Sequence, residues 1–415
     1  MQLSKKMKMK ILHTSDWHLG RQLYNQRRTD EFEAFLDWLI KTINGHNVDA
    51  LLVTGDVFDT TTPSATTQEM YYEFLHRASH SCCRHIVIVG GNHDSPTLLN
   101  APKSLLKNMN IHVVGEMCEN LQDEVITLHG KDGKPEVIVC AVPFLRDRDV
   151  RTVDANENIE DKAAKLINGI ATHYDEVAAI AQKQSLEAGN IPVVATGHLF
   201  TTADRSNNGD GVRELYVGTL AHIDGERFPP VFKYVALGHL HIAQTVGKSH
   251  HIRYSGSPIP MGFNEANQHK KVVIVEFGVP EIQISEMDIP RFKALHRIEG
   301  SAADILEKVK QLKANNEKGW LEVTLNAGDN IPDLPEQIAN LLIDTDLVLL
   351  STKNRRAFEN AQFTSFTVET LEEMQPNDVF DKCLEAKNVS DELKAELKPC
   401  FDEILNHYYN NTTEN

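Results

Sequence analysis

Short apolar runs recur along the first 280 residues, and longer segments of helical or irregular pattern separate them. Between the first two runs, Asp30 to Ile43 repeats Phe, Leu and Ile at helical spacing, which predicts an amphipathic helix. Strand, helix and strand in this order predict an α/β fold with a largely parallel sheet. The expected strands are Lys10 to His13, Ala50 to Thr54, His85 to Val89, Val137 to Val142, Val193 to Thr196, Tyr234 to Leu237 and Val272 to Phe277.

The pattern changes after Phe277. Ser301 followed by Asp304 is typical of a capping box, here at the start of a helix that runs through Leu312. An extended segment precedes this helix, and a strand, a second helix and another strand follow it. The four ranges are Ile282 to Ile298, Trp320 to Leu325, Pro335 to Leu342 and Leu347 to Leu350. They predict a small second α/β domain.

Two short amphipathic helices are expected near the C-terminus, on either side of Asn388-Val389-Ser390. Pro399 should bend or interrupt the second of them. Their apolar faces are Val379, Phe380, Cys383 and Leu384, and Leu393, Leu397, Phe401, Ile404, Leu405 and Tyr408. Such helices either pack on their own protein or bind a partner helix. The expected division of the chain is therefore residues 1–281, 282–365 and 366–415.

Length and composition limit the class of protein. A chain of 415 residues provides material for two or three domains. It contains no run of about eighteen apolar residues, as a membrane span would need, and its basic N-terminus lacks the apolar region of a signal peptide. We therefore expect a cytoplasmic protein. The six cysteines have no C-x-x-C spacing, which favours reduced, mostly buried thiols over a zinc site or a disulfide framework.

The net charge of −17 speaks against a protein that binds nucleic acid through a broadly basic surface. Its distribution softens this objection, because residues 366–415 carry twelve Asp and Glu against four Lys, a balance of −8 that leaves −9 for the rest. Arginines cluster at two places, where they are either phosphate contacts or solvated surface charge. These are Arg21, Arg27 and Arg28, and Arg146, Arg148 and Arg151.

Five short polar motifs begin where the expected strands end, at the strand termini that open onto the ligand crevice of such sheets. They supply carboxylate, amide and imidazole groups, which suit Mn²⁺, Fe²⁺ or Zn²⁺. The motifs are Asp16-Trp17-His18, Gly55-Asp56-Val57-Phe58-Asp59, Gly91-Asn92-His93-Asp94, Gly197-His198 and Gly238-His239-Leu240-His241. Each motif alone is weak, but five in succession at comparable strand ends predict one metal centre.

The spacing within the motifs suggests individual roles. An extended backbone at Asp16-Trp17-His18 would place the carboxylate and the imidazole on one side and Trp17 in the core. The same alternation applies to His239 and His241, with Leu240 in the core. Asp56 has two oxygens with which to bridge two ions, and Asn92 adds a neutral amide oxygen.

His93 lies beside Asn92 and is expected to face the substrate and donate a proton to a departing alkoxide. Asp59 is expected to fix the tautomer of His93, and Asp94 is a weaker candidate for the same role. Other histidines have simpler interpretations. His13 is expected to be packed or to support a ligand, whereas surface positions are expected for His76, His80, His85, His250 and His251. Ser255-Gly256-Ser257-Pro258 is either part of a DNA path or a simple turn.

The order Asp-x-His, Gly-Asp-x-x-Asp, Gly-Asn-His-Asp, Gly-His and Gly-His-x-His resembles the calcineurin-like metallophosphoesterases, a two-metal family that hydrolyses phosphate esters. The amino-acid sequences of residues 11–20, 55–60 and 254–260 are similar to those of the bacterial nuclease subunits of this family. The resemblance spans the first 280 residues. It implies a layered β-sandwich flanked by helices, a small α/β capping domain and C-terminal helices that bind a partner.

The resemblance also implies an assignment of the site. One ion would be held by Asp16, His18, Asp56 and His241, and the other by Asp56, Asn92, His198 and His239. His93 would be the catalytic histidine, supported by Asp59. Some relatives in other kingdoms carry His where this chain has Asp59. The ions would be Mn²⁺ and the substrate double-stranded DNA, cut from its 3′ ends or nicked at hairpins. The partner would be an ATPase with a long coiled coil, in a complex built on a homodimer.

Two alternatives to a DNA nuclease remain open from the sequence. The first is a DNA-end-binding scaffold whose metal site is structural, and the second is a phosphatase of the same superfamily. A complete ligand set with His93 beside it favours an enzyme, because a structural site has no use for an exposed proton donor. The long extension beyond residue 280 speaks against a simple phosphatase.

Overall fold

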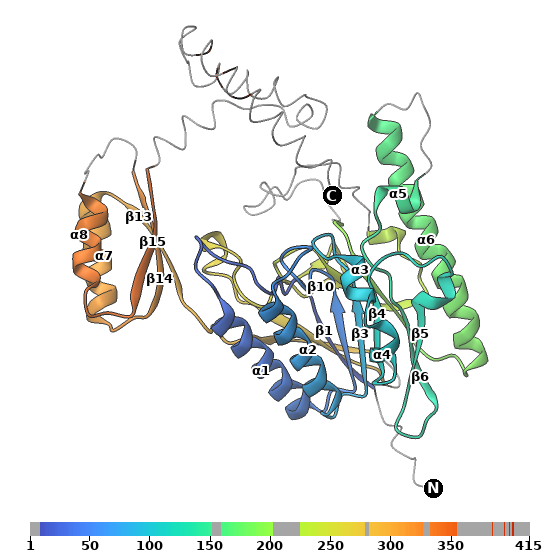
Figure 1. Cartoon of the computed structure of the whole chain (residues 1–415). Helices are drawn as coiled ribbons and strands as arrows, with labels where there is room; N and C mark the ends of the chain where they lie inside the picture. The colour runs from blue at the N-terminus through green and yellow to red at the C-terminus, as the bar shows by residue number, and fades with distance from the viewer. Residues whose placement is uncertain are drawn as a thin grey trace.

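The computed structural model describes residues 9–151, 159–201, 225–278, 282–326 and 333–354, and the single positions Leu384, Lys394, Lys398 and Phe401. The predicted C-terminal helices therefore lie almost wholly outside the described residues. Two six-stranded sheets pack face to face, helices cover their outer faces, and a three-stranded sheet forms a separate small body beside them (Figure 1). None of the described helices is long and apolar enough to cross a membrane.

The first sheet has the strand order β12-β11-β1-β2-β3-β4. Its strands are β1 (Lys10–Thr14), β2 (Ala50–Thr54), β3 (His85–Val89), β4 (Ile111–Val114), β11 (Lys271–Glu276) and β12 (Gln283–Asp288). The first four run parallel, and β11 and β12 add antiparallel pairs at one side. Four helices belong to this half of the sandwich: α1 (Thr29–His46), α2 (Ala65–Ser79), α3 (Pro96–Asn100) and α4 (Lys103–Lys107).

The second sheet has the order β5-β6-β7-β8-β10-β9, and the long helix α6 (Ile159–Glu187) packs on its outer face (Figure 1). Its strands are β5 (Val125–His129), β6 (Pro135–Cys140), β7 (Val193–His198), β8 (Phe232–Gly238), β9 (Gln244–Val246) and β10 (Ser249–Tyr254). The short helix α5 (Asp147–Val150) and the 3-10 turns η1 (Leu121–Glu124), η2 (Gly225–Arg227) and η3 (Phe263–Glu265) complete the two-sheet body.

The central strands are buried on both faces, which explains their unbroken apolar runs. In β2, Leu51 and Val53 join the core under α1 and α2, while Ala50 and Leu52 join the core between the two sheets. Alternate residues of one strand thus belong to two different cores. This packing fixes the register, because a slip by one residue would exchange the two faces.

The small body beside the sandwich is a parallel α/β unit with the strand order β13-β14-β15. Its elements are β13 (Leu295–Gly300), α7 (Ala302–Ala314), β14 (Gly319–Leu325), α8 (Leu334–Leu342) and β15 (Leu347–Asn354). The predicted capping box is confirmed, since Ser301 and Asp304 exchange hydrogen bonds at the start of α7. The unit has its own apolar core, as the sequence predicted for a second domain.

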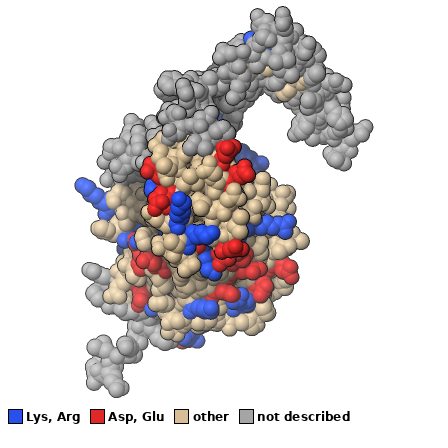
Figure 2. All heavy atoms as spheres, turned by 90° about the vertical axis from the view of Figure 1, so that its left-hand side faces the viewer, with Lys and Arg blue, Asp and Glu red and all other residues tan. Residues whose placement is uncertain are grey.

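All seven strands expected in the first 280 residues are present, with ends that shift by at most two residues, and the expected helix over Asp30 to Ile43 is α1. The α/β class is confirmed. The expected boundaries after residues 281 and 365 remain predictions. On the side that carries the small domain, basic and acidic side chains are interspersed rather than gathered by sign (Figure 2).

Candidate metal centre

The predicted ligands come from two sheets whose strand ends meet at one rim. Asp16 and His18 follow β1, Asp56 follows β2, and Asn92 follows β3 of the first sheet. His198 ends β7, and His239 and His241 follow β8 of the second sheet. A direct hydrogen bond joins the two halves, because the backbone N–H of His239 donates to Asp16 Oδ1 at 2.9 Å. The structure therefore brings all seven predicted ligands into one centre.

One group of donor atoms gathers around His18. Its Nε2 lies 3.2 Å from His241 Nε2 and 3.5 Å from Asp56 Oδ2. Asp16 belongs to the same group, since one ligand atom from each of Asp16, His18 and His241 lies within 4.8 Å of the others. Two imidazoles and two carboxylates thus point at one small volume.

A second group gathers around His198. Its Nε2 lies 3.3 Å from Asp56 Oδ2 and 3.0 Å from Asn92 Oδ1. His239 Nδ1 lies 3.2 Å from the same amide oxygen. Asp56 Oδ2 is therefore approached from both sides, by His18 of one group and by His198 of the other.

The hydrogen bonds behind the ligands fit a cation in each group. The Nδ1–H of His198 donates to the Thr54 carbonyl at 3.0 Å, and the Nδ1–H of His241 donates to Glu265 Oε1 at 3.1 Å. Each bond turns Nε2 toward the centre, and this nitrogen would coordinate an ion once it has lost its proton, which is the arrangement that metal-binding histidines adopt. The donor set of oxygen and imidazole nitrogen suits divalent ions.

The backbone conformation at the ligands differs from the prediction. Asp16, His18, Asp56 and His239 all have positive φ, between 48° and 104°. The expected extended alternation at Asp16-Trp17-His18 and at His239-Leu240-His241 was therefore wrong, because the chain has left the strand and turned at these positions. The predicted packing of the intervening side chains is confirmed, with Trp17 and Leu240 buried in separate cores. Such backbone strain is common at functional sites.

Two glycines allow the ligand loops to approach one another. Gly55 has a φ of +88°, and a Cβ there would lie 2.2 Å from His198 Nδ1. Gly91 has no unusual φ, but a Cβ there would lie 2.1 Å from Asp56 Oδ1. The glycine before each ligand in the sequence motifs is thus explained at these two positions by close contact with another ligand.

We expect Gly91→Ala to damage the centre, because the added methyl group would also lie 2.3 Å from the backbone nitrogen of Asp56. The ligand loop must then shift, at a cost of about 1–3 kcal/mol in the free energy of unfolding and with weaker binding of divalent ions. Denaturant unfolding and an ion titration measure both effects. Gly45→Ala in α1 is the control, since its Cβ would meet nothing within 4 Å. Ion binding by Gly91→Ala equal to that of the unmodified protein would contradict the expectation.

Electrostatics bind the central groups tightly to one another. Burial alone would raise the pKa of the Asp56 carboxyl, but His198, His18 and His93 hold it well below its usual range. Burial would lower the pKa of His198, yet Asp56 and Asp16 raise it to about 9. Burial and the neighbouring His198 lower the pKa of His239 to about 3. The centre therefore holds an ionised carboxylate and a cationic imidazole in contact, and a bound cation would replace the proton on His198.

His93 lies beside the centre, with its ring centroid 4.9 Å from that of His18. Its backbone N–H donates to Asp56 Oδ1 at 2.9 Å, and its Nδ1–H donates to the backbone carbonyl of Asp59 at 3.1 Å. Its Nε2 makes no hydrogen bond to another described residue. The tautomer is thus set by Asp59, as expected from the sequence, but through the carbonyl and not through the carboxylate.

The carboxylates of Asp59 and Asp94 have other partners. Asp59 Oδ1 lies 2.9 Å from Arg21 Nη1 and 3.3 Å from His18 Nδ1, so this side chain supports a ligand. One of its carboxylate oxygens also lies within 4.8 Å of a ring nitrogen of His93, without a hydrogen bond to it. Asp94 accepts hydrogen bonds from the backbone N–H groups of Val57, Phe58 and Gly91. It ties two ligand loops together, and its carboxylate makes no hydrogen bond to the neighbouring His93.

A set of buried side chains supports the ligands from behind, a role that the sequence did not predict for them. Ser15 Oγ donates to Asp16 Oδ2 and lies 2.8 Å from Ser255 Oγ. Glu265, which bonds to His241, also accepts a 2.6 Å hydrogen bond from the buried Lys270. Burial raises the pKa of Glu265, but His241 and Lys270 outweigh this effect and lower it to about 2. Because Ser255 and Ser257 are buried, the segment Ser255-Gly256-Ser257-Pro258 supports the centre from behind, and its serines cannot line a DNA path.

Other predicted positions have mixed outcomes. Arg28 is buried against Glu31 and the Pro260 carbonyl, so it does not contact phosphates. His13 is packed as expected, with hydrogen bonds to Tyr234 and Thr54. His85 is buried on β3, so its predicted surface position was wrong.

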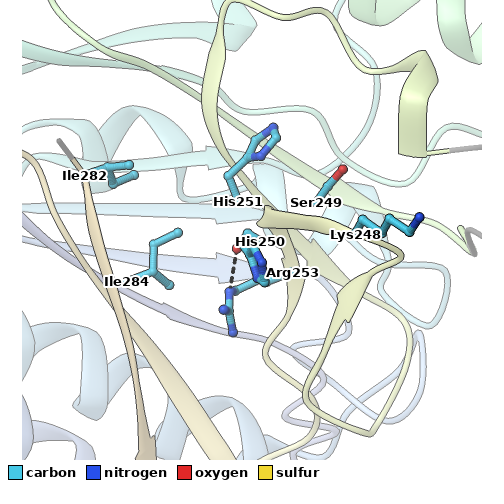
Figure 3. A pocket seen from close by; sticks show the side chains of 7 residues that line it. All are labelled: Lys248, Ser249, His250, His251, Arg253, Ile282 and Ile284. Carbon is cyan, nitrogen blue, oxygen red and sulfur yellow. Dashed lines mark hydrogen bonds between the residues drawn. The ribbon is translucent and has the colours of Figure 1, made fainter.

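A hollow of about 620 Å³ lies elsewhere on the sandwich, between the β9–β10 hairpin and the segment that leads into β12 (Figure 3). It is lined by Lys248, Ser249, His250, His251, Arg253, Ile282 and Ile284. None of the predicted metal ligands lines it. Since its lining includes no ligand, the hollow is separate from the metal centre. The charge of Arg253 in its lining is paired with Glu286 at 2.6 Å.

Comparison with known families matches this chain to two family models. Calcineurin-like phosphoesterase matches residues 9–243, a range that is more than half of the chain and includes all seven predicted ligands. A model described as Type 5 capsule protein repressor C-terminal domain, with the short name SbcD_C, matches residues 291–388. The predicted resemblance to the calcineurin-like metallophosphoesterases is confirmed.

Curated relatives extend the match over nearly the whole chain. The SbcD subunit of the nuclease SbcCD from Escherichia coli (strain K12) is 33% identical over 400 residues, which cover 96% of this chain and 98% of that protein. The protein of the same name from Bacillus subtilis (strain 168) is 28% identical over 78% of this chain and 80% of its own length. A crystal structure of a dimetal phosphatase from Danio rerio is more distant, with 9% identity, a TM-score of 0.38 and coverage of 68% of this chain and 98% of that one. On the sequence matches, the chain belongs to the SbcD family of nuclease subunits within the calcineurin-like phosphoesterases.

Proposed function

We propose that this chain is the metal-dependent nuclease subunit of a complex that processes DNA ends in repair and recombination. One observation carries the proposal: Nε2 atoms of His18 and His198, from different sheets, approach the same Asp56 oxygen at 3.5 and 3.3 Å. A carboxylate between two imidazole-containing groups is what a bridged pair of cations requires. The names of two curated relatives support this activity, because both are named as a subunit of a nuclease.

The proposed ligand assignment follows the two groups of donor atoms. Asp16, His18, Asp56 and His241 form site 1, and Asp56, Asn92, His198 and His239 form site 2. Mn²⁺ is the ion we propose, on the grounds of mixed oxygen and imidazole donors. Bound ions would supply Lewis-acid activation of water and neutralise charge on the phosphate oxygens.

The chain itself would supply proton transfer and orientation. His93 keeps Nδ1 bonded to the Asp59 carbonyl, so that Nε2 is free to hold a proton for the departing 3′ oxygen of the DNA. Asp59, through its carboxylate, would orient His18, and Glu265 would orient His241. These contacts fix ring orientation before substrate binds, which is what precise positioning of reacting groups demands.

The proposed substrates are double-stranded DNA ends, digested in the 3′ to 5′ direction, and hairpins, which are nicked. The proposed partner is an SbcC-type ATPase with a coiled coil, bound by residues 366–415, in an assembly that contains two copies of this chain. The relatives are named as one subunit of a nuclease called SbcCD, and such a name denotes a protein that works with another subunit. The proposed division into a nuclease domain (residues 1–281), a capping domain (282–365) and a partner-binding segment (366–415) agrees with this scheme.

A non-catalytic scaffold is disfavoured by the environment of His93. A purely structural ion site needs no further imidazole beside it, yet the half-buried His93 is held in one orientation with Nε2 left unbonded among the described residues. No specific contact favours a phosphatase over a nuclease.

Cleavage assays with the full-length chain test the proposal. We expect degradation of blunt double-stranded DNA and nicking of hairpins in Mn²⁺, much weaker activity in Mg²⁺, and stimulation by the ATPase subunit with ATP. A small phosphate monoester should be turned over poorly under the same conditions. Equal activity with both ions would contradict the choice of Mn²⁺, and preference for the monoester would contradict the nuclease.

A further inference from the structure

The junction between the small domain and the sandwich contacts two segments that each support a ligand of site 1. One segment is the loop of residues 19–28, which follows His18, and the other is η3, which lies behind His241. Both reach the small domain through a shared apolar cluster, here called the junction cluster. It consists of Leu23, Phe263, Ala266, Leu295, Trp320 and Leu350.

Tyr24 occupies the tip of the loop in an unusual backbone conformation. Leu23 and Gln26 exchange backbone hydrogen bonds of 3.1 and 2.9 Å, and the two residues between them, Tyr24 and Asn25, have φ of 48° and 63°. A tight turn with two positive φ values favours Asn and Gly, whereas an aromatic residue adopts this conformation at a cost in free energy. Contacts made by the Tyr24 side chain must offset that cost.

The Tyr24 hydroxyl donates a 2.6 Å hydrogen bond to Glu322 Oε2 on β14 of the small domain. Glu322 is buried, and Lys353 Nζ lies 2.7 Å from the same oxygen. Lys353 also lies 5.9 Å from the centre of the Tyr24 ring, and Arg297 Nε lies 3.8 Å from Glu322 Oε1. The small domain thus holds the tip of the loop by a partly buried hydrogen bond to a charged acceptor.

A first route leads from this tip to His18. Three residues before Tyr24, Arg21 donates to Asp59 Oδ1 at 2.9 Å, and this oxygen lies 3.3 Å from His18 Nδ1. Arg21 Nε also donates to the Met261 carbonyl at 3.4 Å. The loop is therefore linked to the His18 ring through one carboxylate.

A second route leads from the junction cluster to His241. Phe263 begins η3, and its ring centroid lies 6.1 Å from that of Tyr24. Glu265 ends η3, accepts the Met261 backbone N–H at 3.0 Å through Oε2, and contacts His241 through Oε1. Both routes therefore meet at residues 261–265 and end on ligands of the same site.

We propose that the small domain positions His18 and His241 through this junction, and so sets the ion affinity of site 1 without affecting site 2. The inference rests on the ligand assignment of the proposed function. The ligands unique to site 2 have no comparable link to the small domain among the described residues, since His198 is held by the Thr54 carbonyl inside the sandwich and shares Asn92 with His239. Small interfaces between domains permit relative motion, so any partner that displaces the small domain would weaken site 1.

The test compares Mn²⁺ binding by full-length variants, using calorimetric titration together with manganese EPR, which distinguishes a coupled ion pair from a lone ion. Tyr24→Phe removes only the hydroxyl, and Glu322→Gln removes the charge that it meets. For both variants we expect about tenfold weaker binding of one ion per chain and an unchanged affinity for the other ion. Tenfold is the lower end of the effect on metal affinity of losing a residue that hydrogen-bonds to a metal ligand. Glu265→Gln, which acts directly on His241, should give the same pattern with a larger effect.

Asp30→Asn is the matched control, because the 2.9 Å ion pair between Asp30 and Lys293 crosses the same junction but leads to no ligand. It should bind both ions as the unmodified protein does. Unchanged affinity for both ions in Tyr24→Phe and Glu322→Gln would overturn the inference, and so would equal weakening of both ions. If the unmodified protein binds two ions and cuts DNA while these variants match it, the inference alone fails. Fewer than two ions in the unmodified protein would defeat the proposed function as well.

Discussion

Replacing Asp56 by asparagine should abolish tight binding of the ion pair and reduce DNA cleavage by at least about a hundredfold, since loss of an outer partner of a metal ligand alone costs about 10–100-fold. Asparagine keeps one oxygen, which can still accept the His93 N–H that Asp56 Oδ1 accepts at 2.9 Å. It loses the charge and the second oxygen, which faces both His18 and His198. Manganese titration and cleavage of blunt DNA measure the two effects.

Asp123→Asn is a suitable control for Asp56→Asn, because Asp123 is an exposed carboxylate on η1. It should retain both ions and full activity. If Asp56→Asn bound two ions with unchanged affinity, the bridging role of Asp56 would be refuted and the proposed mechanism with it.

Replacing His93 by glutamine should separate binding from cleavage. Proton transfer by a positioned side chain contributes about 10²–10⁴-fold to a rate, so we expect a loss of this size in DNA cleavage with little change in manganese or DNA affinity. His93 contacts Asp56 through its backbone N–H, which the substitution leaves in place. Single-turnover cleavage at saturating Mn²⁺, together with DNA-binding isotherms, provides the comparison.

A DNA substrate with an activated leaving group gives a sharper control for His93→Gln. If the imidazole protonates the departing oxygen, a leaving group that needs no proton should restore much of the lost rate. Full activity of His93→Gln on ordinary DNA would exclude His93 from proton transfer, and an equal loss on both substrates would assign it another role.

The most predictable part of the fold was the set of strands buried on both faces. Ala50–Thr54 and His85–Val89 are continuous apolar or nearly apolar runs, because each strand contributes to two cores. By contrast, β10 contains Ser249, His250 and Arg253, and none of its first three residues is buried, so its pattern suggested a polar loop. The helix α2 was also missed, although its buried residues Tyr71, Phe74, Leu75 and Ala78 recur at helical spacing.

The ligands of the centre could be predicted from residue type and from their place after strands, but their support could not. Glu265 and Lys270 lie far in sequence from the residues they serve and belong to no recognisable motif, so only packing reveals their contact with His241. Asp59 shows a subtler limit, because its place in the motif predicted a contact with His93 but could not tell its carbonyl from its carboxylate. The positive φ values of four ligands could not be predicted either, since Asp and His are enriched in this conformation but still adopt it at only a small fraction of their positions.

The two halves of the centre come from segments far apart in the chain. The hydrogen bond between Asp16 and His239 illustrates this, because its partners are 223 positions apart in the sequence. Domains form progressively as a polypeptide is synthesised from its N-terminus. A nascent chain that has not yet reached His198 lacks three of the seven ligands and cannot assemble the ion pair. A growing polypeptide of this kind would thus remain harmless to nucleic acid in its surroundings until the sandwich is complete.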